Sequence, residues 1–342
     1  MGSITYQFKN SKNLQEILEK IHSQQKASTN AKKLGVKLPE WEGPTMETYH
    51  QYLNHAVKFG EFCKEIYGIR YCDDCRCHIQ DYADWLVAQG KSASTVHSYL
   101  AGVCAAFGIS LAEIKHPIRH TANNTRSRGR KASDKRRDRQ RACSPRLCDF
   151  ACHVGIRRDE CAALRGNDLT PDESGYLCVL VRKGKGGKRQ LQRVPPGSED
   201  FVAAYFDGSS NFVFSKAEMN NKIDLHHYRH YLAWEAYQGY QSRLEADPGY
   251  REQLIAEIKI RWQQNCKKPW NPREVEGVYR IRGKNKALAI AAEMPDRNSR
   301  LALAATSIFH LSHWRLDVSV SNYILAVAAD KVKRKIKENK EK

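Results

Sequence analysis

The sequence has no long apolar run and no apolar segment at its start. No stretch approaches the roughly 18 apolar residues that a membrane-spanning helix needs, so we expect no membrane partner. Residues 1–6 lack the apolar core of a secretory signal, which favours a cytoplasmic protein.

Acidic residues are in the minority. The 342 residues include 57 Lys or Arg against 38 Asp or Glu, a net charge of +19. A polyanionic partner is therefore expected, and nucleic acid fits best, because the basic residues are spread over the whole chain rather than gathered in one membrane-facing segment. Since 41% of the residues are hydrophobic, the chain can build cores for about two domains of ~100–200 residues each.

The eleven cysteines are an odd number in a large chain without a secretory signal. We therefore expect reduced, mostly buried thiols rather than a disulfide framework. Cys72, Cys75 and Cys77, followed by His78, have the short spacing of zinc ligands, but no second Cys or His pair follows at zinc-finger spacing. A loop leading into a helix is the favoured interpretation and metal binding the alternative, so no metal and no cofactor are expected.

The first third of the chain is expected to be helical. Residues 1–43 are basic with a weak helical pattern that ends at Gly35 and Pro39, typical of a helical or partly disordered N-terminal arm. Three amphipathic segments between residues 45 and 111 predict a small helical bundle, which we assign to a domain at 44–114. Gly90 ends the second segment, and Ser92 or Ser94 is the N-cap candidate for the third.

Residues 115–141 are predicted to be a basic interdomain linker. They contain almost nothing apolar and eleven Lys or Arg, so they either lie against phosphates, the favoured interpretation, or form a bare tether. The candidate DNA contacts in this linker are Arg119, Arg126, Arg128, Arg130 and Lys131.

A second domain is expected over residues 142–330, before a basic C-terminal tail at 331–342. Helices are predicted at 147–154, from about 159, at 225–236, at 301–310 and at 318–329. Two strands, 176–181 and 189–194, flank a Gly-rich, Lys-rich turn that suits a hairpin. Residues 234–300 are too irregular to assign beyond one or two helical turns at Leu254, Ile255 and Ile258.

Three basic constellations suit chemistry on a phosphodiester. The five-coordinate transition state gathers negative charge, and guanidinium groups such as those of Arg157 and Arg229 would stabilise it with paired hydrogen bonds. His226 lies three residues before Arg229, so one helix face can present both. Taken alone, each fragment is typical of a surface ion pair or a solvated helix.

The order and spacing of these parts resemble the tyrosine recombinases, also called phage integrases, over about residues 45–330. The run Gly155-Ile156-Arg157 followed by Glu160 matches their first signature, and the Gly-Lys-rich turn at 183–188 matches a second. His226 with Arg229 and His230 matches the third. Leu311-Ser312-His313, with Tyr323 ten positions later, matches the last.

The resemblance implies a role for each residue. Arg157 and Arg229 would bind the phosphate, with Glu160 and His230 in support. Lys185 would protonate the 5′ oxygen as it leaves, with Lys183 and Lys188 as competitors for that role and as DNA contacts. His226 would transfer a proton. His313 would help to hold the phosphate or move protons, and Tyr323 would be the nucleophile.

The alternative for Tyr323 is an ordinary core residue on an apolar helix. If it is the nucleophile, the expected intermediate is a 3′-phosphotyrosine that religates without ATP or metal.

The resemblance also implies a fold and partners. The fold would be mainly α with a small β-hairpin or sheet, in which a helical core-binding domain and a mixed α/β catalytic domain form a clamp around double-stranded DNA. A homotetramer on two DNA sites, accessory DNA-bending or directionality factors and a nucleoid-associated location would follow. A mobile element would encode such an integrase. An inactive DNA-binding protein of the same fold and a type IB topoisomerase are the alternatives.

Two features depart from the family pattern. Ser312 stands where the family usually has glycine, which is expected to affect the start of that helix but not the imidazole of His313. Residues 234–300 make the interval between Arg229 and His313 much longer than in the family. An exposed helical excursion is the favoured interpretation of this insertion, and a contact to DNA or to a neighbouring protomer is the alternative.

Overall fold

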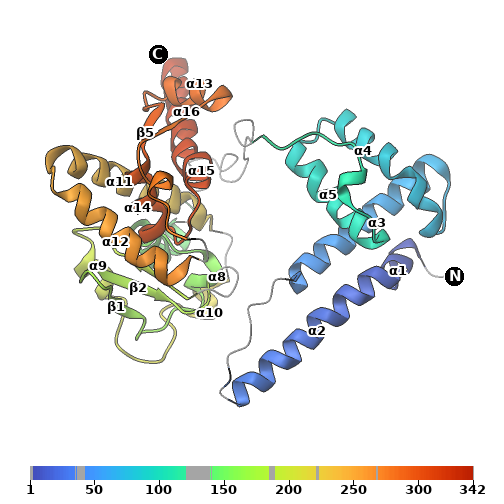
Figure 1. Ribbon diagram of the computed structural model, residues 1–342, viewed down its shortest axis with the longest axis horizontal. Helices are drawn as coiled ribbons and strands as arrows, with labels where there is room; N and C mark the ends of the chain where they lie inside the picture. The colour runs from blue at the N-terminus through green and yellow to red at the C-terminus, as the bar shows by residue number, and fades with distance from the viewer. Residues whose placement is uncertain are drawn as a thin grey trace. The chain divides into compact units, whose positions relative to one another are not determined.

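The computed structural model describes residues 3–34, 36, 43–120, 139, 141–184, 189–220, 223–266 and 269–341. The chain divides into two compact units, Met1–His120 and Thr121–Lys342 (Figure 1). Helices dominate both units, and the strands that the structure describes lie in the second, so the expectation of a mainly α fold with a small sheet is confirmed. Within the described ranges, no helix is both long and apolar enough to cross a bilayer.

The first unit is a helical bundle. Its predicted amphipathic segments are confirmed as helices. The predicted cap at Ser92 is present, because its hydroxyl accepts from the backbone N–H of Thr95 at 3.2 Å. The Thr45 hydroxyl caps α3 in the same way, accepting from the backbone N–H of Thr48 at 3.2 Å. The elements are α1 (Ile4–Lys9), α2 (Lys12–Lys33), α3 (Met46–Tyr67), η1 (Asp73–His78), α4 (Ile79–Ala88), α5 (Ala93–Phe107) and η2 (Leu111–Glu113).

The predicted N-terminal arm packs into the core of the first unit. Phe8, Leu14 and Ile21 are buried among the aromatic residues of α3 and α5, and the Phe8 ring meets that of Phe107 edge-on at 5.8 Å. A Cβ on Gly60 would lie 2.7 Å from side-chain atoms of α1, so this glycine allows the close approach. Helices α1 and α2 are therefore part of the bundle.

The second unit combines helices with two small antiparallel sheets. It begins with α7 (Pro145–His153), α8 (Arg158–Cys161), β1 (Leu169–Pro171), β2 (Leu177–Val181), β3 (Gln190–Arg193), α9 (Glu199–Ala203) and α10 (Lys216–Met219). It continues with α11 (Leu225–Ala246), α12 (Tyr250–Asn265), η5 (Pro272–Glu274), β4 (Val278–Arg280), α13 (Gly283–Ala291) and β5 (Arg297–Ser299). It closes with α14 (Arg300–Ala305), η6 (Thr306–His310), α15 (Leu316–Ser319), η7 (Val320–Ile324) and α16 (Leu325–Glu341).

The predicted hairpin strands are confirmed. Strand β2 pairs with β1 on one side and with β3 on the other, with Cys178 opposite Arg193 and Val181 opposite Gln190. The apolar residues of β2 are buried against α7 and its neighbours. The tip of the hairpin, residues 185–188, lies outside the described residues.

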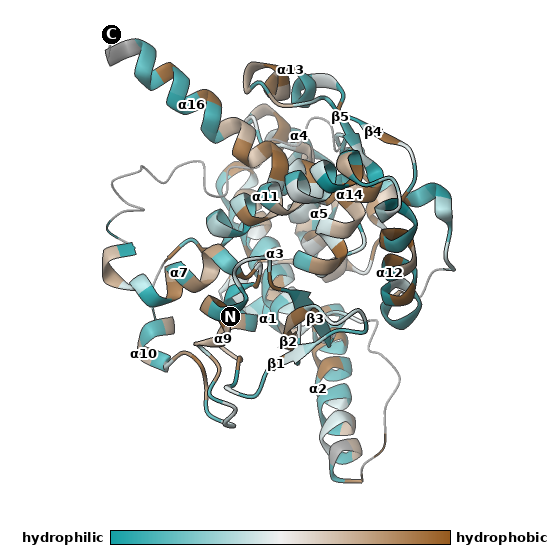
Figure 2. Ribbon diagram, turned by 90° about the vertical axis from the view of Figure 1, so that its left-hand side faces the viewer, coloured by the Kyte–Doolittle hydropathy of each residue, from teal (hydrophilic) through white to brown (hydrophobic). Residues whose placement is uncertain are grey.

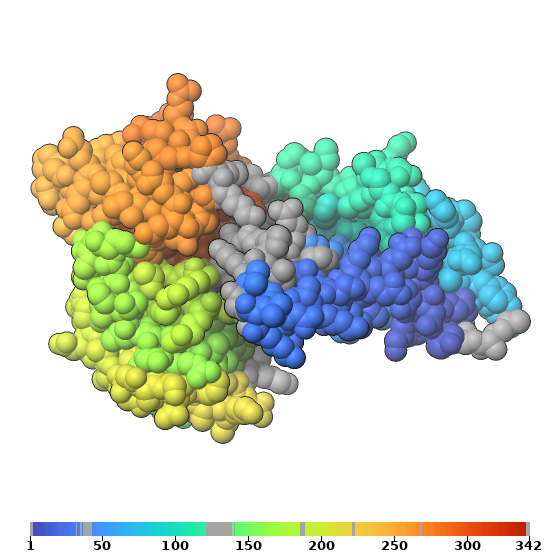
Figure 3. Space-filling model, turned by 60° about the horizontal axis from the view of Figure 1, so that its bottom comes forward, coloured from blue at the N-terminus to red at the C-terminus, as the bar shows by residue number. Residues whose placement is uncertain are grey.

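The insertion at 234–300 is not an exposed excursion. Helix α11 runs to Ala246, so Trp234 lies in its middle, and α12 has 16 residues rather than one or two turns. One face of α12 is buried against α14 and its neighbours through Leu254, Ile258 and Trp262. Figure 3 shows residues of this region, in light orange, continuous with the rest of the second unit.

Two charged residues explain why the sequence pattern did not predict the full length of α12. Glu257 and Arg261 fall on the same buried face as the apolar residues, at helical spacing, so the apolar period is interrupted where the helix is buried. Both are almost fully inaccessible to solvent, which is rare for charged residues unless they are paired.

A buried ion network pairs them. The Arg193 guanidinium of β3 binds Asp172 at 2.6 Å and Glu257 at 2.7 Å, and Arg261 binds the same Asp172 oxygen at 3.1 Å. Arg193 also lies 3.6 Å from the centre of the Phe309 ring. Because the network joins the sheet, α12 and η6, it fixes the insertion to the rest of the second unit.

The C-terminal residues continue the last predicted helix. Helix α16 runs to Glu341, so most of the predicted basic tail is helical, and Figure 2 shows its hydropathy becoming more hydrophilic toward the C-terminus. The predicted helices at 301–310 and 318–329 are confirmed, but each contains a π-helical segment, η6 and η7. These wide turns flank His313.

Replacing Arg193 with methionine should lower the free energy of unfolding of the second unit by about 3–5 kcal/mol, because it leaves the buried Glu257 carboxylate without a cation and removes one of the two arginines that bind Asp172. Urea denaturation of the purified chain measures this. The matched control is Arg251→Met on the exposed side of α12, expected within about 0.5 kcal/mol of wild type. Equal stability of both variants would contradict the structural role of the network.

Candidate active site around Tyr323

Helix α11 presents three of the predicted residues together. His226, Arg229 and His230 lie at positions i, i+3 and i+4, and therefore on one helix face. The rings of His226 and His230 are 4.7 Å apart, and Arg229 is only 1% exposed. This face of α11 points into the protein.

The Arg229 guanidinium is held by three acceptors. Its Nε–H donates to the Tyr323 hydroxyl at 3.1 Å, Nη1 donates to the Gly155 carbonyl, and Nη2 donates to the Leu311 carbonyl at 2.5 Å. Three of its five N–H groups are thus used within the described residues, which leaves up to two for a ligand. Burial lowers the pKa of this guanidinium, and the nearby Tyr323 opposes that shift.

The His310 and Leu311 carbonyls at the end of η6 accept hydrogen bonds from buried side chains. A helix end leaves carbonyls without intrahelical partners, and a buried carbonyl needs a donor. The Gln192 amide, itself fully buried, donates to His310 O at 3.0 Å and to Gly155 O at 2.7 Å, while Arg229 donates to Leu311 O. Gly155 is therefore in close contact with the end of η6.

Tyr323 lies within a cage of imidazoles. Its ring centre is 5.3 Å from that of His226, 5.5 Å from that of His230 and 5.8 Å from that of His313, which stacks on it at 24°. Only 4% of Tyr323 is exposed. The residues predicted from two distant parts of the sequence, 226–230 and 313–323, therefore meet around the Tyr323 side chain.

The backbone around the site is irregular. Tyr323 belongs to the π-helical segment η7, and π-helical turns are frequent at functional sites. Ser312 has φ of 49°, a left-handed conformation that costs most residues about 1–2 kcal/mol but glycine little. Ser312 therefore holds a backbone conformation that glycine would adopt with less strain.

Arg157 is oriented by Glu160. The carboxylate accepts from the Arg157 backbone N–H at 2.9 Å and from its guanidinium at 2.7 Å, and it is only 3% exposed. The Arg157 side chain remains 28% exposed and lines a cavity of about 270 Å³ that His313 also lines. The positive charge of Arg157 also acts on Arg229 and on His313.

His313 has two buried ring nitrogens that no described residue satisfies. Both of its ring nitrogens are shielded from solvent and have no hydrogen-bond partner among the described residues. Burial, followed by the charges of Arg229 and Arg157, lowers the pKa of His313 to about 3. An anion beside it would offset the two arginines, supply an acceptor and so favour its protonated form.

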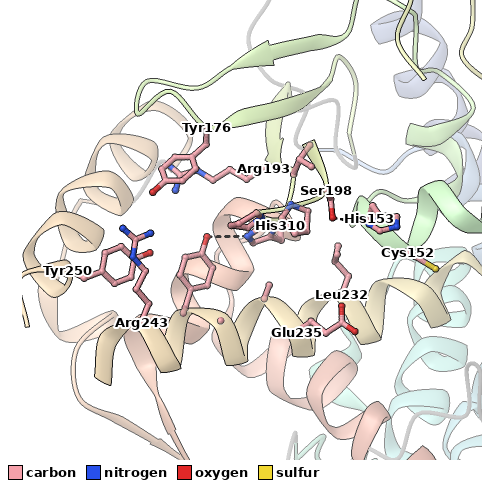
Figure 4. A pocket seen from close by; sticks show the side chains of 16 residues that line it. Cys152, His153, Tyr176, Arg193, Ser198, Leu232, Glu235, Arg243, Tyr250 and His310 are labelled. Atoms are coloured by element: carbon pink, nitrogen blue, oxygen red, sulfur yellow. Dashed lines mark hydrogen bonds between the residues drawn. The ribbon is translucent and has the colours of Figure 1, made fainter. Parts of the chain in front are cut away.

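His310, three residues earlier, belongs to another cavity. Its ring accepts or donates a hydrogen bond at 3.1 Å with the Tyr240 hydroxyl, and burial followed by the charge of Arg193 lowers its pKa to about 3. Figure 4 shows it in the wall of a cavity of about 580 Å³, with Tyr176, Tyr250 and Arg243 at one end. None of the residues predicted from sequence lines this larger cavity.

The remaining predicted residues are not brought to Tyr323 by any described contact. Lys183 is exposed just beyond β2, and Arg119 is exposed in the first unit. Six further candidates lie outside the described residues: Lys185, Lys188, Arg126, Arg128, Arg130 and Lys131.

The cysteine cluster has local partners. The thiol of Cys75 donates to the Tyr71 carbonyl at 3.4 Å and that of Cys77 to the Asp74 carbonyl at 3.5 Å. All eleven cysteines are free, and six of them are buried. In the part of the chain that the structure describes, no group of three or more His, Cys, Asp or Glu residues is arranged to hold a metal ion.

Sequence reasoning did not identify Gln192, His310 or the role of Gly155. Gln192 lies in a strand where a buried amide breaks the expected apolar pattern, and nothing in the sequence links it to the end of η6. Apart from its position three residues before His313, nothing in the sequence distinguishes His310 from the other histidines. The need for glycine at position 155 cannot be read from local sequence, because it comes from the close approach of the His310 carbonyl, which is distant in sequence.

Adding a Cβ at Gly155 should destabilise the second unit by about 1–3 kcal/mol, because that atom would lie 2.3 Å from the His310 carbonyl oxygen. Thermal or urea unfolding of Gly155→Ala tests this. Gly239→Ala on α11 is the control: nothing lies within 4 Å, so helix propensity should make it neutral or about 0.5–1 kcal/mol more stable. Wild-type stability of Gly155→Ala would contradict the close contact.

Acidification should destabilise the protein partly through His310. Its folded pKa of about 3 lies below the ordinary value near 6.5, so between these values the unfolded chain binds more protons and stability falls as pH falls. Between pH 7 and pH 5 this one residue should remove about 2 kcal/mol.

The comparison of wild type with His310→Gln by urea denaturation at both pH values measures that contribution. The acid-induced loss should shrink by about 2 kcal/mol in His310→Gln and stay unchanged in His50→Gln, whose histidine is exposed. An identical loss in wild type and His310→Gln would show that His310 does not titrate in this window.

Neither a protein-family model nor a curated protein matches this chain.

Proposed function

We propose that the chain is a tyrosine site-specific recombinase that cleaves and rejoins DNA through a 3′-phosphotyrosine intermediate. The observation that carries the proposal is the Tyr323 hydroxyl, hydrogen-bonded to the Arg229 guanidinium at 3.1 Å and surrounded by the rings of three histidines. A core tyrosine needs one hydrogen-bond partner and no such surroundings.

In the proposed reaction, the Tyr323 oxygen attacks the phosphorus of a DNA phosphodiester. A bond forms between that oxygen and phosphorus, the bond from phosphorus to the 5′ oxygen breaks, and the tyrosine proton passes to His226. A lysine protonates the departing 5′ oxygen; Lys185 is the first candidate, with Lys183 and Lys188 as the others. Attack by a 5′ hydroxyl on the phosphotyrosine reverses the step without ATP or metal.

Arg157, Arg229 and His313 would stabilise the pentacoordinate phosphorus. Arg157 is partly exposed and pre-oriented by Glu160, Arg229 retains up to two N–H donors, and His313 has unused ring nitrogens. Fixed donors in a site shielded from water stabilise developing charge without reorganisation, which is usually the largest catalytic contribution. His230 supports the cage from α11.

The reaction requires the site to open. Tyr323 is 4% and Arg229 1% exposed, so a duplex can reach them only when Tyr323 exchanges the Arg229 N–H for the phosphate. We assign this movement to η7, whose irregular turns follow the strained Ser312.

The wider proposal concerns the partners. Double-stranded DNA would lie between the first unit, acting as the core-binding domain, and the second, joined by the basic linker. A homotetramer on two DNA sites, accessory DNA-bending or directionality factors, a mobile element as the source and a nucleoid-associated location complete it. The net charge of +19 supports DNA as the partner.

A second candidate function is an inactive DNA-binding protein of the same fold. The burial of Arg229 and Tyr323 favours it, because a site that never opens would bind DNA without cutting it. A type IB topoisomerase would share the chemistry and is separated by relaxation of supercoiled plasmid without paired sites.

Covalent trapping tests the proposal. Nicked suicide duplexes tiled across the DNA that flanks the coding sequence should give a protein–DNA adduct on a denaturing gel with wild type, and none with Tyr323→Phe. Tyr237→Phe, which alters a buried tyrosine outside the site, should keep the adduct. Tight binding with no adduct on any duplex would favour the inactive protein.

A further inference from the structure

We propose that the cavity beside His313 binds an unstacked nucleotide, with its 3′-phosphate at Arg157 and His313 and its base against Trp314. This inference rests on the proposed function and names the part of the DNA that the site receives. The cavity lies among the start of α8, β3 with the residue before it, the end of α12, and η6 with the segment that follows it.

The size of the cavity exceeds the need of a phosphate. Its volume of about 270 Å³ corresponds to roughly nine water molecules at ~30 Å³ each. A phosphate group has five heavy atoms, so a large part of the cavity remains beyond it. That remaining volume is available to a sugar or a base.

One side of the cavity suits an anion. Arg189 has no carboxylate within ion-pair distance in the described part of the chain, and His313 contributes two ring nitrogens without partners there. Arg157 keeps 28% of its side chain exposed despite its bond to Glu160. Excess positive charge beside an unsatisfied imidazole favours a bound phosphate.

The other side suits a nucleobase. Trp314 supplies an aromatic ring, and base–aromatic stacking is sequence-tolerant because every base has a π-face. Leu191 and Ile308 add apolar surface. The amides of Gln190 and Asn265 donate to Glu160 and to the Arg261 carbonyl, at 3.4 and 3.3 Å, so their oxygens can accept from the N–H groups on a base edge.

The insertion makes this second side. Helix α12 supplies Asn265 directly, and its Trp262 meets the Trp314 ring edge-on at 5.2 Å. Trp262 also contacts Trp270 at 5.7 Å, and Arg261 donates to the Leu191 carbonyl at 2.9 Å. The buried ion network also links α12 to Arg193 of β3 and to Asp172.

The test compares thymidine 3′-monophosphate with inorganic phosphate by isothermal titration of the full chain. Stacking should make the nucleotide bind at least about 5-fold more tightly than phosphate. Trp314→Ala should reduce that ratio to near one and leave phosphate binding unchanged, whereas Trp314→Phe should retain most of the preference. Asn265→Ala should reduce the ratio without affecting phosphate.

Equal affinity for nucleotide and phosphate in wild type, or no nucleotide binding, would overturn the proposal. A Trp314→Ala variant that weakens both ligands equally would also overturn it, because the tryptophan would then only support the fold. Failure of the proposed function gives a different result: no DNA adduct forms although the nucleotide preference of wild type persists.

Discussion

The candidate site depends on one buried cation, Arg229. Arg229 has lost nearly all contact with water, so its charge is tolerable only because the Gly155 carbonyl, the Leu311 carbonyl and the Tyr323 hydroxyl accept its N–H groups. These acceptors belong to the turn before α8, the end of η6 and η7. One guanidinium therefore connects Gly155 with two segments more than 150 residues later in the sequence, and their mutual positions define the candidate site.

The same interaction keeps the site closed. While the Tyr323 hydroxyl accepts from Arg229, neither residue is accessible to a phosphodiester. A phosphate is a stronger acceptor than a phenol because it is charged. Under the proposed function, the DNA phosphate would therefore replace the tyrosine at this guanidinium and release the hydroxyl in one exchange. In this proposal, the donors that hold the closed form become those that stabilise the transition state, and the neutral His313 acquires its acceptor from the substrate.

Local patterns predicted much of the fold and the site. The helices of the first unit have apolar faces and polar caps such as Ser92, and the spacing of His226 and Arg229 places them on one helix face. The sequence did not predict helix α12, because Glu257 and Arg261 interrupt its apolar face. Their burial there is stabilised by ion-pair partners that are distant in sequence. The role of Gln192 and the close approach at Gly155 were not predicted for the same reason, since their partners lie at the end of η6.

The identity of the nucleophile is tested most directly by mapping the trapped protein–DNA adduct. After nuclease and trypsin digestion, mass spectrometry should find the nucleotide on the peptide between Arg315 and Lys331, with fragment ions that place it on Tyr323. The same peptide contains Ser319 and Ser321, which provide an internal comparison. A nucleotide on either serine, or on any other peptide, would contradict the assignment of Tyr323 as the residue that attacks DNA.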